Sequence, residues 1–501
     1  MMSFNTIRKQ TQDIISFGIG ARLLNFLKGI LIAFYIGASY RTDVYLVAFS
    51  ASVFLIGIVA EALIVSLIPI YQQIEKRDGK KGRFEFTDNL ISFWTLAGLF
   101  LILIGYLAAP LILRAFGPGF GSEGSREAVR LFRLGLPIIL MHVWRAIFAG
   151  YLQAQHKFRA GAKGGVANSL IYILYLIFLS RRFGLEGLMV AGILAVGVQA
   201  FLLAQPVLKL QGYRYRPRLL LKERNLVRLN MFIIPIMLGV GINNLNQAVD
   251  NAIGSFLQAG TIAELNYADG IVDLFVGALL MALVTAIFPV ISERMRLGDS
   301  EETMHSISYS LRLVTMVSIP STVLLIFLAQ PIVRLFYERG EFGAEATIAT
   351  ATMLIWYGVG IFGMGLLLLI TRIYYAREDT LTPVAISAVA LVLNIILDIG
   401  FVQLIGPGGL ALGTSLASTI AAFYGIWRLN RLYGFLTWAE VGMKGLKLFM
   451  AGIVMSSILV LLTGSFGDIA QGSFIGTLVL VVVSGAIGIG SFLSIVFVTR
   501  A

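Results

Sequence analysis

Long, uninterrupted runs of apolar residues fill most of this sequence, and each is about as long as a lipid bilayer is thick. A helix needs about 20 apolar residues to cross the hydrocarbon core, and helices and closed barrels are the structures that span it. Barrel strands alternate in short segments, whereas these runs are continuous. We therefore predict an all-α integral membrane protein of about fourteen transmembrane helices. The predicted spans are residues 14–36, 44–71, 89–113, 129–154, 162–180, 187–208, 227–257, 267–292, 304–329, 347–371, 380–405, 408–427, 441–463 and 472–499.

The composition argues against several classes of protein. Charged residues make up 13% of the chain, about half of the roughly 25% that is usual in soluble domains. The sequence has no Cys and three His, and no two His stand at metal-ligand spacing. A disulfide framework, a zinc site and Cys or Ser–His catalysis are therefore not expected. An enzyme acting on lipid-linked sugars would need a large polar outer loop, and the predicted outer loops are short. We expect a transporter without a bound cofactor.

Lys and Arg are distributed unevenly between the two sides of the predicted spans. One alternate set of loops contains 26 of the 39 basic residues and the opposite set contains 7. Cytoplasmic loops are enriched in Lys and Arg, so we predict cytoplasmic termini in a multi-pass protein of the bacterial inner membrane. The net charge of +12 then reflects topology, and its expected partners are anionic lipid headgroups rather than nucleic acid. No small-residue cleavage site follows the first apolar run, which predicts a retained helix.

Short motifs recur in the two halves of the chain at a nearly constant offset. Pro69 in LIPIY corresponds to Pro289 in IFPVI, and Pro110 in AAPLILRAF corresponds to Pro331 in AQPIVRLF. These offsets of 220 and 221 residues predict two six-helix lobes. Because six is even, the lobes have the same topology and form parallel repeats about an axis along the membrane normal. The predicted parts are a first lobe (1–210), a cytoplasmic basic linker (211–226), a second lobe (227–431) and two further helices (441–500).

Cationic side chains inside predicted spans are expensive in lipid and mark candidate functional sites. Arg22 and Lys28 lie in the first predicted helix, and Arg145 lies in the fourth. A group of cations in a lipid-embedded cavity suits a diphosphate headgroup, which they would bind through charge-assisted hydrogen bonds. The alternative is that these cations pair internally with Glu61 and Asp43.

The second lobe carries polar groups of a different kind. Asn246 and Asp250 lie one turn apart in the span 227–257, and Asn394 and Asp398 lie one turn apart in the next-to-last helix of the lobe. Residues at this spacing share a helix face. Carboxylate and amide oxygens without a nearby cation suit Na⁺ or a proton as a coupling ion; the alternative is a hydrogen-bonded packing seam. No ATP-binding motif is present, so a gradient is the expected source of energy.

The two C-terminal helices, 441–463 and 472–499, are apolar on nearly all faces. Helices of this kind outside the repeat suit a groove for a long isoprenoid tail. The alternative is a purely structural scaffold.

Eight segments together resemble one known family, although each alone would be a weak signal. They are GASYRTDVYLVAF (37–49), VAEALIVSLIPIY (59–71), FGPGF (116–120), GYLQAQHKF (150–158), LNYADG (265–270), RLFYERGEFGAEAT (334–347), YYAREDTLTPVAIS (374–387) and LNIILD with GGLALGTSLAS (393–418). With them the chain is similar, over about residues 14–440, to the MurJ (MviN) lipid II flippases of the multidrug/oligosaccharidyl-lipid/polysaccharide exporter superfamily. The resemblance implies fourteen helices in two lobes, with the last two forming a lipid-tail groove.

The resemblance also implies a substrate and two groups of site residues. The substrate would be undecaprenyl-diphosphate carrying the peptidoglycan unit, and the other expected partners are membrane lipids, with the protein acting as a monomer. The implied substrate-binding residues are Arg22, Lys28, Asp43 at an outer gate and Glu61. The presence of ionisable groups inside predicted spans adds Arg145 and Asp269 as candidates. The implied sodium-binding residues are Asp250, Asn394, Asp398, Thr414 and the backbone of Leu410.

The sequence departs from the family pattern at two cationic positions. The family usually has Arg in the second helix, where this chain has Ile56 and Gly57, and after YAD in the eighth helix, where this chain has Gly270. Arg145 is a candidate replacement for one of them. The main hypothesis is a lipid II flippase that works by alternating access. The alternatives are a flippase for another lipid-linked oligosaccharide, such as an exopolysaccharide, O-antigen or teichoic-type precursor, and a cation-coupled drug exporter.

Overall fold

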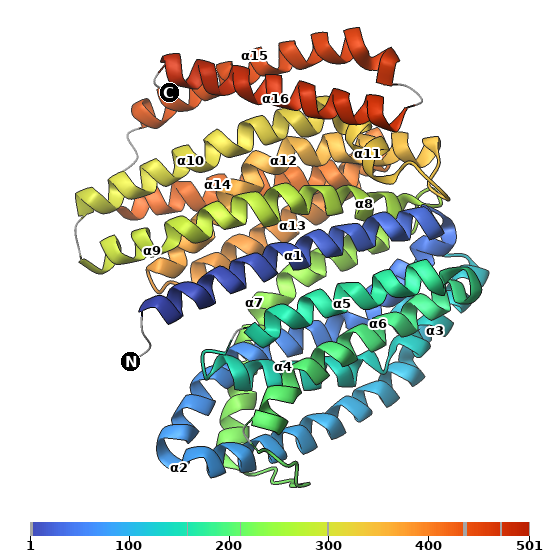
Figure 1. Ribbon diagram of the computed structural model, residues 1–501, viewed down its shortest axis with the longest axis vertical. Helices are drawn as coiled ribbons and strands as arrows, with labels where there is room; N and C mark the ends of the chain where they lie inside the picture. The colour runs from blue at the N-terminus through green and yellow to red at the C-terminus, as the bar shows by residue number, and fades with distance from the viewer. Residues whose placement is uncertain are drawn as a thin grey trace. The chain divides into compact units, whose positions relative to one another are not determined.

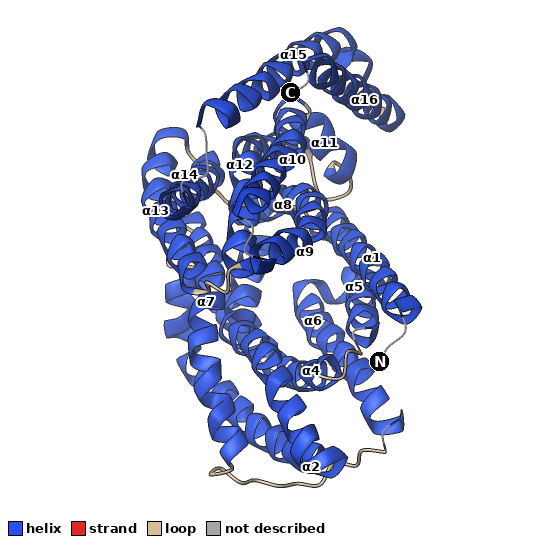
Figure 2. Ribbon diagram, turned by 90° about the vertical axis from the view of Figure 1, so that its left-hand side faces the viewer, coloured by secondary structure: helices blue, strands red, loops and turns tan. Residues whose placement is uncertain are grey.

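The computed structural model describes residues 4–157, 159–210, 212–297, 300–433, 438–470 and 473–499. All regular structure in these ranges is helical (Figure 1, Figure 2), which confirms the predicted all-α class. The elements are α1 (Phe4–Ile36), α2 (Tyr40–Phe116), α3 (Ser122–Gly135), α4 (Ile138–Gln153), α5 (Arg159–Phe178), α6 (Ser180–Gln205), η1 (Pro206–Leu210), α7 (Arg224–Gly254), α8 (Thr261–Asp273), η2 (Leu274–Leu280), α9 (Met281–Leu297), α10 (Ser300–Phe327), α11 (Ala329–Tyr337), α12 (Ala344–Ala376), α13 (Leu381–Ile405), α14 (Gly408–Tyr433), α15 (Trp438–Ala470) and α16 (Phe474–Thr499).

The helices agree with the predicted spans. Eleven helical stretches among the described residues are long and apolar enough to cross a membrane, and α2 is counted once among them. The 77 residues of α2 cover two predicted spans, 44–71 and 89–113. The spans predicted at 14–36 and 227–257 coincide with α1 and α7, which lie outside those eleven.

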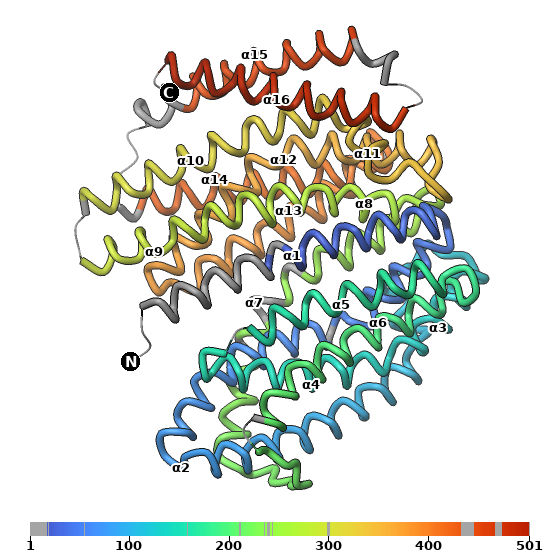
Figure 3. The backbone as a smooth tube through the Cα atoms, viewed as in Figure 1, coloured from blue at the N-terminus to red at the C-terminus, as the bar shows by residue number. Residues whose placement is uncertain are grey.

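The two arms of α2 meet at Gly79, where the chain reverses (Figure 3). Gly79 has φ 64° and ψ −157°, a backbone conformation that glycine adopts without strain. The hydroxyls of Tyr71 and Thr87 are 3.0 Å apart, whereas a straight helix would separate these residues by about 24 Å. The Tyr71 ring also packs on Phe86 and on Tyr151 of α4, with centroids 5.5 and 5.2 Å apart. The hairpin at Gly79 is thus closed by a buried aromatic cluster.

The chain divides into two compact units, Met1–Phe256 and Leu257–Ala501. The first contains α1 to α7, and its main helix pairs are α2 with α4, α5 with α6, and α2 with α7. The second contains α8 to α16, and α14 packs along both α12 and α13. Because α7 packs on α2, the contact boundary falls after α7 rather than before it. The repeat boundary at 211–226 is a statement about sequence symmetry and stays a prediction.

In the second unit, α12 and α14 approach closely at positions where α12 has glycine. A Cβ on Gly360 would lie 2.5 Å from Ser415 Cα, and one on Gly363 would lie 2.5 Å from Thr419 Cα. Ser415 Oγ also donates a hydrogen bond to the carbonyl oxygen of Trp356, at 2.8 Å. Small residues allow membrane helices to pack backbone to backbone. The same unit holds α15 and α16 against α10 through a cluster of buried apolar residues: Ile319, Val323, Leu448, Ala451, Met455, Leu459, Phe492 and Val496.

Gly360→Ala is expected to lower the thermal unfolding midpoint of the purified protein by several degrees. The added methyl group meets backbone rather than a flexible side chain, so α12 and α14 must separate, and overpacking of this kind costs about 1–3 kcal/mol. Gly400→Ala on α13 is the matched control, because nothing lies within 4 Å of its added Cβ. Equal midpoints for the two variants would contradict the tight α12–α14 contact.

Candidate functional site

The predicted cations of α1 lie in the first unit on a helix that packs along α5 (Figure 1). Arg22 and Lys28 are both half-buried. The Lys28 ammonium lies 4.7 Å from the centroid of the Tyr172 ring of α5. The face of an aromatic ring attracts a cation, but the ring has no net charge and so does not neutralise the ammonium. Within the part of the chain that the structure describes, no carboxylate forms an ion pair with Lys28. Its charge is therefore held in place and not neutralised.

Arg145 and Glu61 form an ion pair between α4 and α2. Arg145 Nη2 lies 3.2 Å from Glu61 Oε1, with the arginine side chain 15% exposed and the glutamate 55% exposed. The internal pairing considered as an alternative is therefore present for Arg145. However, Arg145 Nε is buried and has no hydrogen-bond partner among the described residues. A buried donor without a partner costs about 1–3 kcal/mol, so this guanidinium keeps a capacity to bind a further acceptor.

His142 lies one turn before Arg145 on α4, and the sequence interpretation did not single it out. Its Nδ1 is likewise buried without a hydrogen-bond partner in the described ranges. The i, i+3 spacing of the two residues was the signal available in the sequence. A lone His in an apolar span gives no further hint, because its surroundings come from residues distant in the chain.

Asp43 and Asp269, the two predicted acidic substrate residues, lie in different units. Asp43 is buried in the first turn of α2, where the helix dipole favours a carboxylate. Asp269 is exposed on α8, one turn before Asp273. Directly after Asp273 the chain continues as the π-helix η2. Such insertions are frequent at functional sites, and no apolar periodicity in the sequence indicated this one.

Three of the predicted sodium-site residues come together in the second unit. Asn394 Nδ2 donates to Asp398 Oδ1 at 3.1 Å and to Thr414 Oγ1 at 3.0 Å. Asp398 is fully buried. Gly413 on α14 permits this approach, because a Cβ there would lie 2.0 Å from Asp398 Oδ1. Asn394 Oδ1 is buried and lacks a hydrogen-bond partner among the described residues.

The two remaining sodium-site residues are placed separately. Leu410 is buried on α14, one turn before Thr414. Asp250 is 8% exposed near the end of α7 and belongs to the first unit. Within the described residues there is no group of three or more His, Cys, Asp or Glu side chains that could hold a metal ion. A site here would therefore be one carboxylate with neutral oxygens, which suits a monovalent cation better than zinc.

The family profile described as "Lipid II flippase MurJ" matches residues 32–480 of the chain. The chain belongs to the MurJ family. A MurJ protein of Vibrio cholerae is 28% identical over 456 residues, which cover 88% of this chain and 86% of that protein. The lipid II flippase MurJ of Burkholderia cenocepacia is 26% identical over 415 residues, or 81% of this chain and 80% of that protein.

Solved structures agree with the family assignment. A lipid II flippase MurJ in an inward closed conformation superposes with a TM-score of 0.82 at 26% identity, over 97% of this chain and 99% of that one. An inward-facing MATE transporter of the MOP superfamily has a TM-score of 0.69 at 16% identity, over 84% of this chain and 98% of that one. At that identity the MATE likeness shows the fold alone. Membership in the MurJ family confirms a multi-pass bacterial inner-membrane transporter rather than an enzyme.

Proposed function

We propose that this protein flips lipid II, undecaprenyl-diphosphate carrying the peptidoglycan unit, from the cytoplasmic to the outer leaflet by alternating access. The observation that carries the proposal is Lys28, a cation within the membrane span of α1 that packs on Tyr172 and pairs with no carboxylate in the described part of the chain. Such a charge is costly in lipid. An anionic diphosphate that enters during transport would offset that cost.

In this mechanism the first unit binds the diphosphate. Lys28 and Arg22 donate charge-assisted hydrogen bonds to its oxygens. Arg145 contributes its free Nε and compensates for one of the two arginines that the family usually has, at Ile56 or Gly57 and at Gly270. Glu61 holds the Arg145 guanidinium until the substrate arrives. Asp43, on the outer side, and Asp269 would contact the substrate as it leaves. The apolar helices α15 and α16 would receive the isoprenoid tail.

The buried polar group on α13 and α14 is the proposed site of the coupling ion. Asp398 Oδ1, Thr414 Oγ1, the unpartnered Asn394 Oδ1 and the Leu410 carbonyl are oxygen donors of the kind that Na⁺ prefers. Asp250 of α7 lies in the first unit and stays a prediction from the family resemblance. A proton on Asp398 is the alternative coupling ion. An ion that binds one state of the protein better than the other shifts the population towards that state. The membrane potential adds about 2.3 kcal/mol per charge per 100 mV.

Two further features belong to the same proposal. Both termini would be cytoplasmic, because the loops on that side carry most of the Lys and Arg residues. We also propose that the protein acts as a monomer. The absence of two family arginines keeps a second candidate function open, namely the transport of undecaprenyl-diphosphate that carries a different saccharide.

Complementation tests which saccharide is carried. Expression of this protein is expected to restore growth of a bacterium depleted of its own lipid II flippase to within about 10-fold of the plating efficiency given by the native gene. Arg145→Gln is expected to reduce this efficiency, while Arg133→Gln, a cation of the neighbouring helix α3, is expected to leave it unchanged. Rescue of a strain that lacks an O-antigen or exopolysaccharide flippase, with no rescue of the lipid II strain, would support the second candidate.

A further inference from the structure

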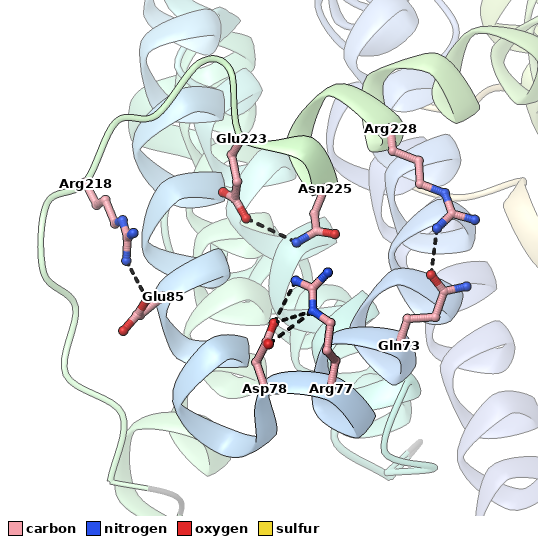
Figure 4. Close-up of polar contacts among 8 residues, drawn as sticks. All are labelled: Gln73, Arg77, Asp78, Glu85, Arg218, Glu223, Asn225 and Arg228. Carbon is pink, nitrogen blue, oxygen red and sulfur yellow. Dashed lines mark hydrogen bonds and ion pairs between the residues drawn. The ribbon is translucent and has the colours of Figure 1, made fainter.

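A basic segment joins two membrane-spanning helices of the first unit in an extended form. This strap, residues 212–223, lies between η1 and α7 and contains no helix. Figure 4 shows it running along the hairpin of α2, with an ion pair between Arg218 of the strap and Glu85 of α2. The preceding α6–η1 stretch and the following α7 are both predicted spans, so the strap begins and ends where helices leave the bilayer. It therefore lies at the membrane–water interface.

Buried side chains of α2 fix the backbone of the strap. Asp88 Oδ1 accepts hydrogen bonds from Tyr213 OH at 2.6 Å and from the Arg216 backbone N–H at 3.1 Å. Asn89 pairs with both backbone groups of Leu220, accepting at 2.7 Å and donating at 3.1 Å. Burial and the hydrogen bond to Asp88 raise the pKa of Tyr213 above its usual value, so this phenol stays protonated and donates. The strap is thus a bound element with a defined inner face.

The outer face of the strap carries cations that its surroundings do not neutralise. Some neighbouring basic residues have partners: Arg218 Nη1 pairs with Glu85 Oε2 at 2.7 Å, and Arg228 Nη1 donates to Gln73 Oε1 at 2.7 Å (Figure 4). Four others are exposed, and their side chains make no hydrogen bond or ion pair within the described residues. They are Arg214, Arg216, Lys222 and, at the start of α7, Arg224.

Apolar side chains stand beside these cations on the same surface. Leu219, Leu220 and Leu221 are 45%, 44% and 60% exposed. The exposed apolar surface continues along α7 at Met231 and Ile234, which are 66% and 63% exposed. Three consecutive exposed leucines are unusual in water. Leucine next to Arg and Lys is the pattern of segments that insert apolar groups at the headgroup level while their cations bind anionic lipid.

We propose that the strap is a binding site for anionic phospholipid headgroups, with Arg214, Arg216 and Lys222 contacting the phosphates and Leu219–Leu221 entering the acyl boundary. The general enrichment of Lys and Arg in cytoplasmic loops explains why the strap is basic. It does not explain why hydrogen bonds with the buried side chains of Asp88 and Asn89 hold the strap in a conformation that exposes its leucines and its cations. The site is separate from the proposed lipid II site and does not depend on it. By anchoring the start of α7 beside α2, the bound lipid would hold the first unit at a fixed depth.

The chain has no Cys, so a single reporter can be placed on the strap without removing others. L221C labelled with bimane, in nanodiscs, is expected to be quenched by brominated phosphatidylglycerol and several-fold less by brominated phosphatidylcholine. Titration of phosphatidylglycerol into the labelled protein in detergent gives an apparent affinity. Each cation near an anionic surface contributes about 1 kcal/mol, so R214Q/R216Q/K222Q is expected to weaken this affinity on the order of 100-fold.

The matched control removes three exposed cations from the opposite set of loops, as R126Q/R181Q/R182Q, and is expected to keep the affinity of the parent protein. Equal affinities for the strap variant and this control would overturn the proposal. So would equal quenching by the two lipids, or a response to inorganic phosphate as large as the response to phosphatidylglycerol. An unquenched label in both bilayers would place the strap in water and point instead to a soluble partner.

Discussion

Lys28→Ala is expected to reduce the rate of lipid II flipping in reconstituted vesicles by about 10- to 100-fold. The basis is the loss of one charge-assisted hydrogen bond to the diphosphate, which is worth about 1.5–3 kcal/mol. The ammonium now lies over the Tyr172 ring and pairs with no carboxylate in the described ranges. Its removal therefore leaves no acidic group unpaired, and the protein should fold normally.

Two controls make this prediction specific. Lys28→Arg keeps the charge and is expected to retain most of the activity. Leu27→Ala truncates an adjacent side chain that is 40% exposed and is expected to have little effect. Size-exclusion profiles and thermal midpoints should match across the three variants. Full flipping by Lys28→Ala, at normal protein levels, would remove the cation from the mechanism.

Asp398→Asn is expected to abolish stabilisation of the purified protein by Na⁺. A ligand that binds the folded state alone stabilises it by about 2.7 kcal/mol when present at 100 times its dissociation constant. Wild-type protein should therefore unfold several degrees higher in NaCl than in KCl at equal ionic strength. The amide of the variant removes the carboxylate that accepts from Asn394 Nδ2 while keeping the size of the side chain.

The control for this experiment is Glu345→Gln, which makes the same chemical change at an exposed carboxylate in the first turn of α12. It should keep the full Na⁺ effect. If wild-type protein shows no difference between the two salts, Na⁺ is not the ligand of this group. A midpoint that instead depends on pH in wild type, but not in Asp398→Asn, would assign the site to a proton.

The sequence predicted the features that depend on local composition. Apolar runs of span length give the transmembrane helices, because the bilayer imposes a length on each. Asn394 and Asp398 were paired correctly because one helical turn separates them. Two separate apolar runs with a basic segment between them predict the hairpin in α2. The contact between Tyr71 and Thr87 that closes this hairpin has no counterpart in the sequence pattern.

Contacts between distant segments could not be derived in this way. The pair of Arg145 with Glu61 was one of two open alternatives, because 84 residues separate the partners and no local rule selects one carboxylate over another. The strap is a clearer case, since Asn89 and Leu220 are 131 residues apart. The sequence alone identifies residues 211–226 only as a basic linker. The hydrogen bonds with Asp88 and Asn89 that fix the strap, residues 212–223, depend on the way α2 folds back at Gly79.

Flipping of lipid II by the purified protein in vesicles, measured against undecaprenyl-diphosphate that carries an unrelated saccharide, tests the proposed function most directly. We expect protein-dependent transfer of lipid II between leaflets that is lost in the Arg22→Ala/Lys28→Ala variant and slower for the other saccharide. Transfer of lipid II at the rate of protein-free vesicles, or equal transfer by the variant, would rule out the proposed role of the two cations in lipid II transport.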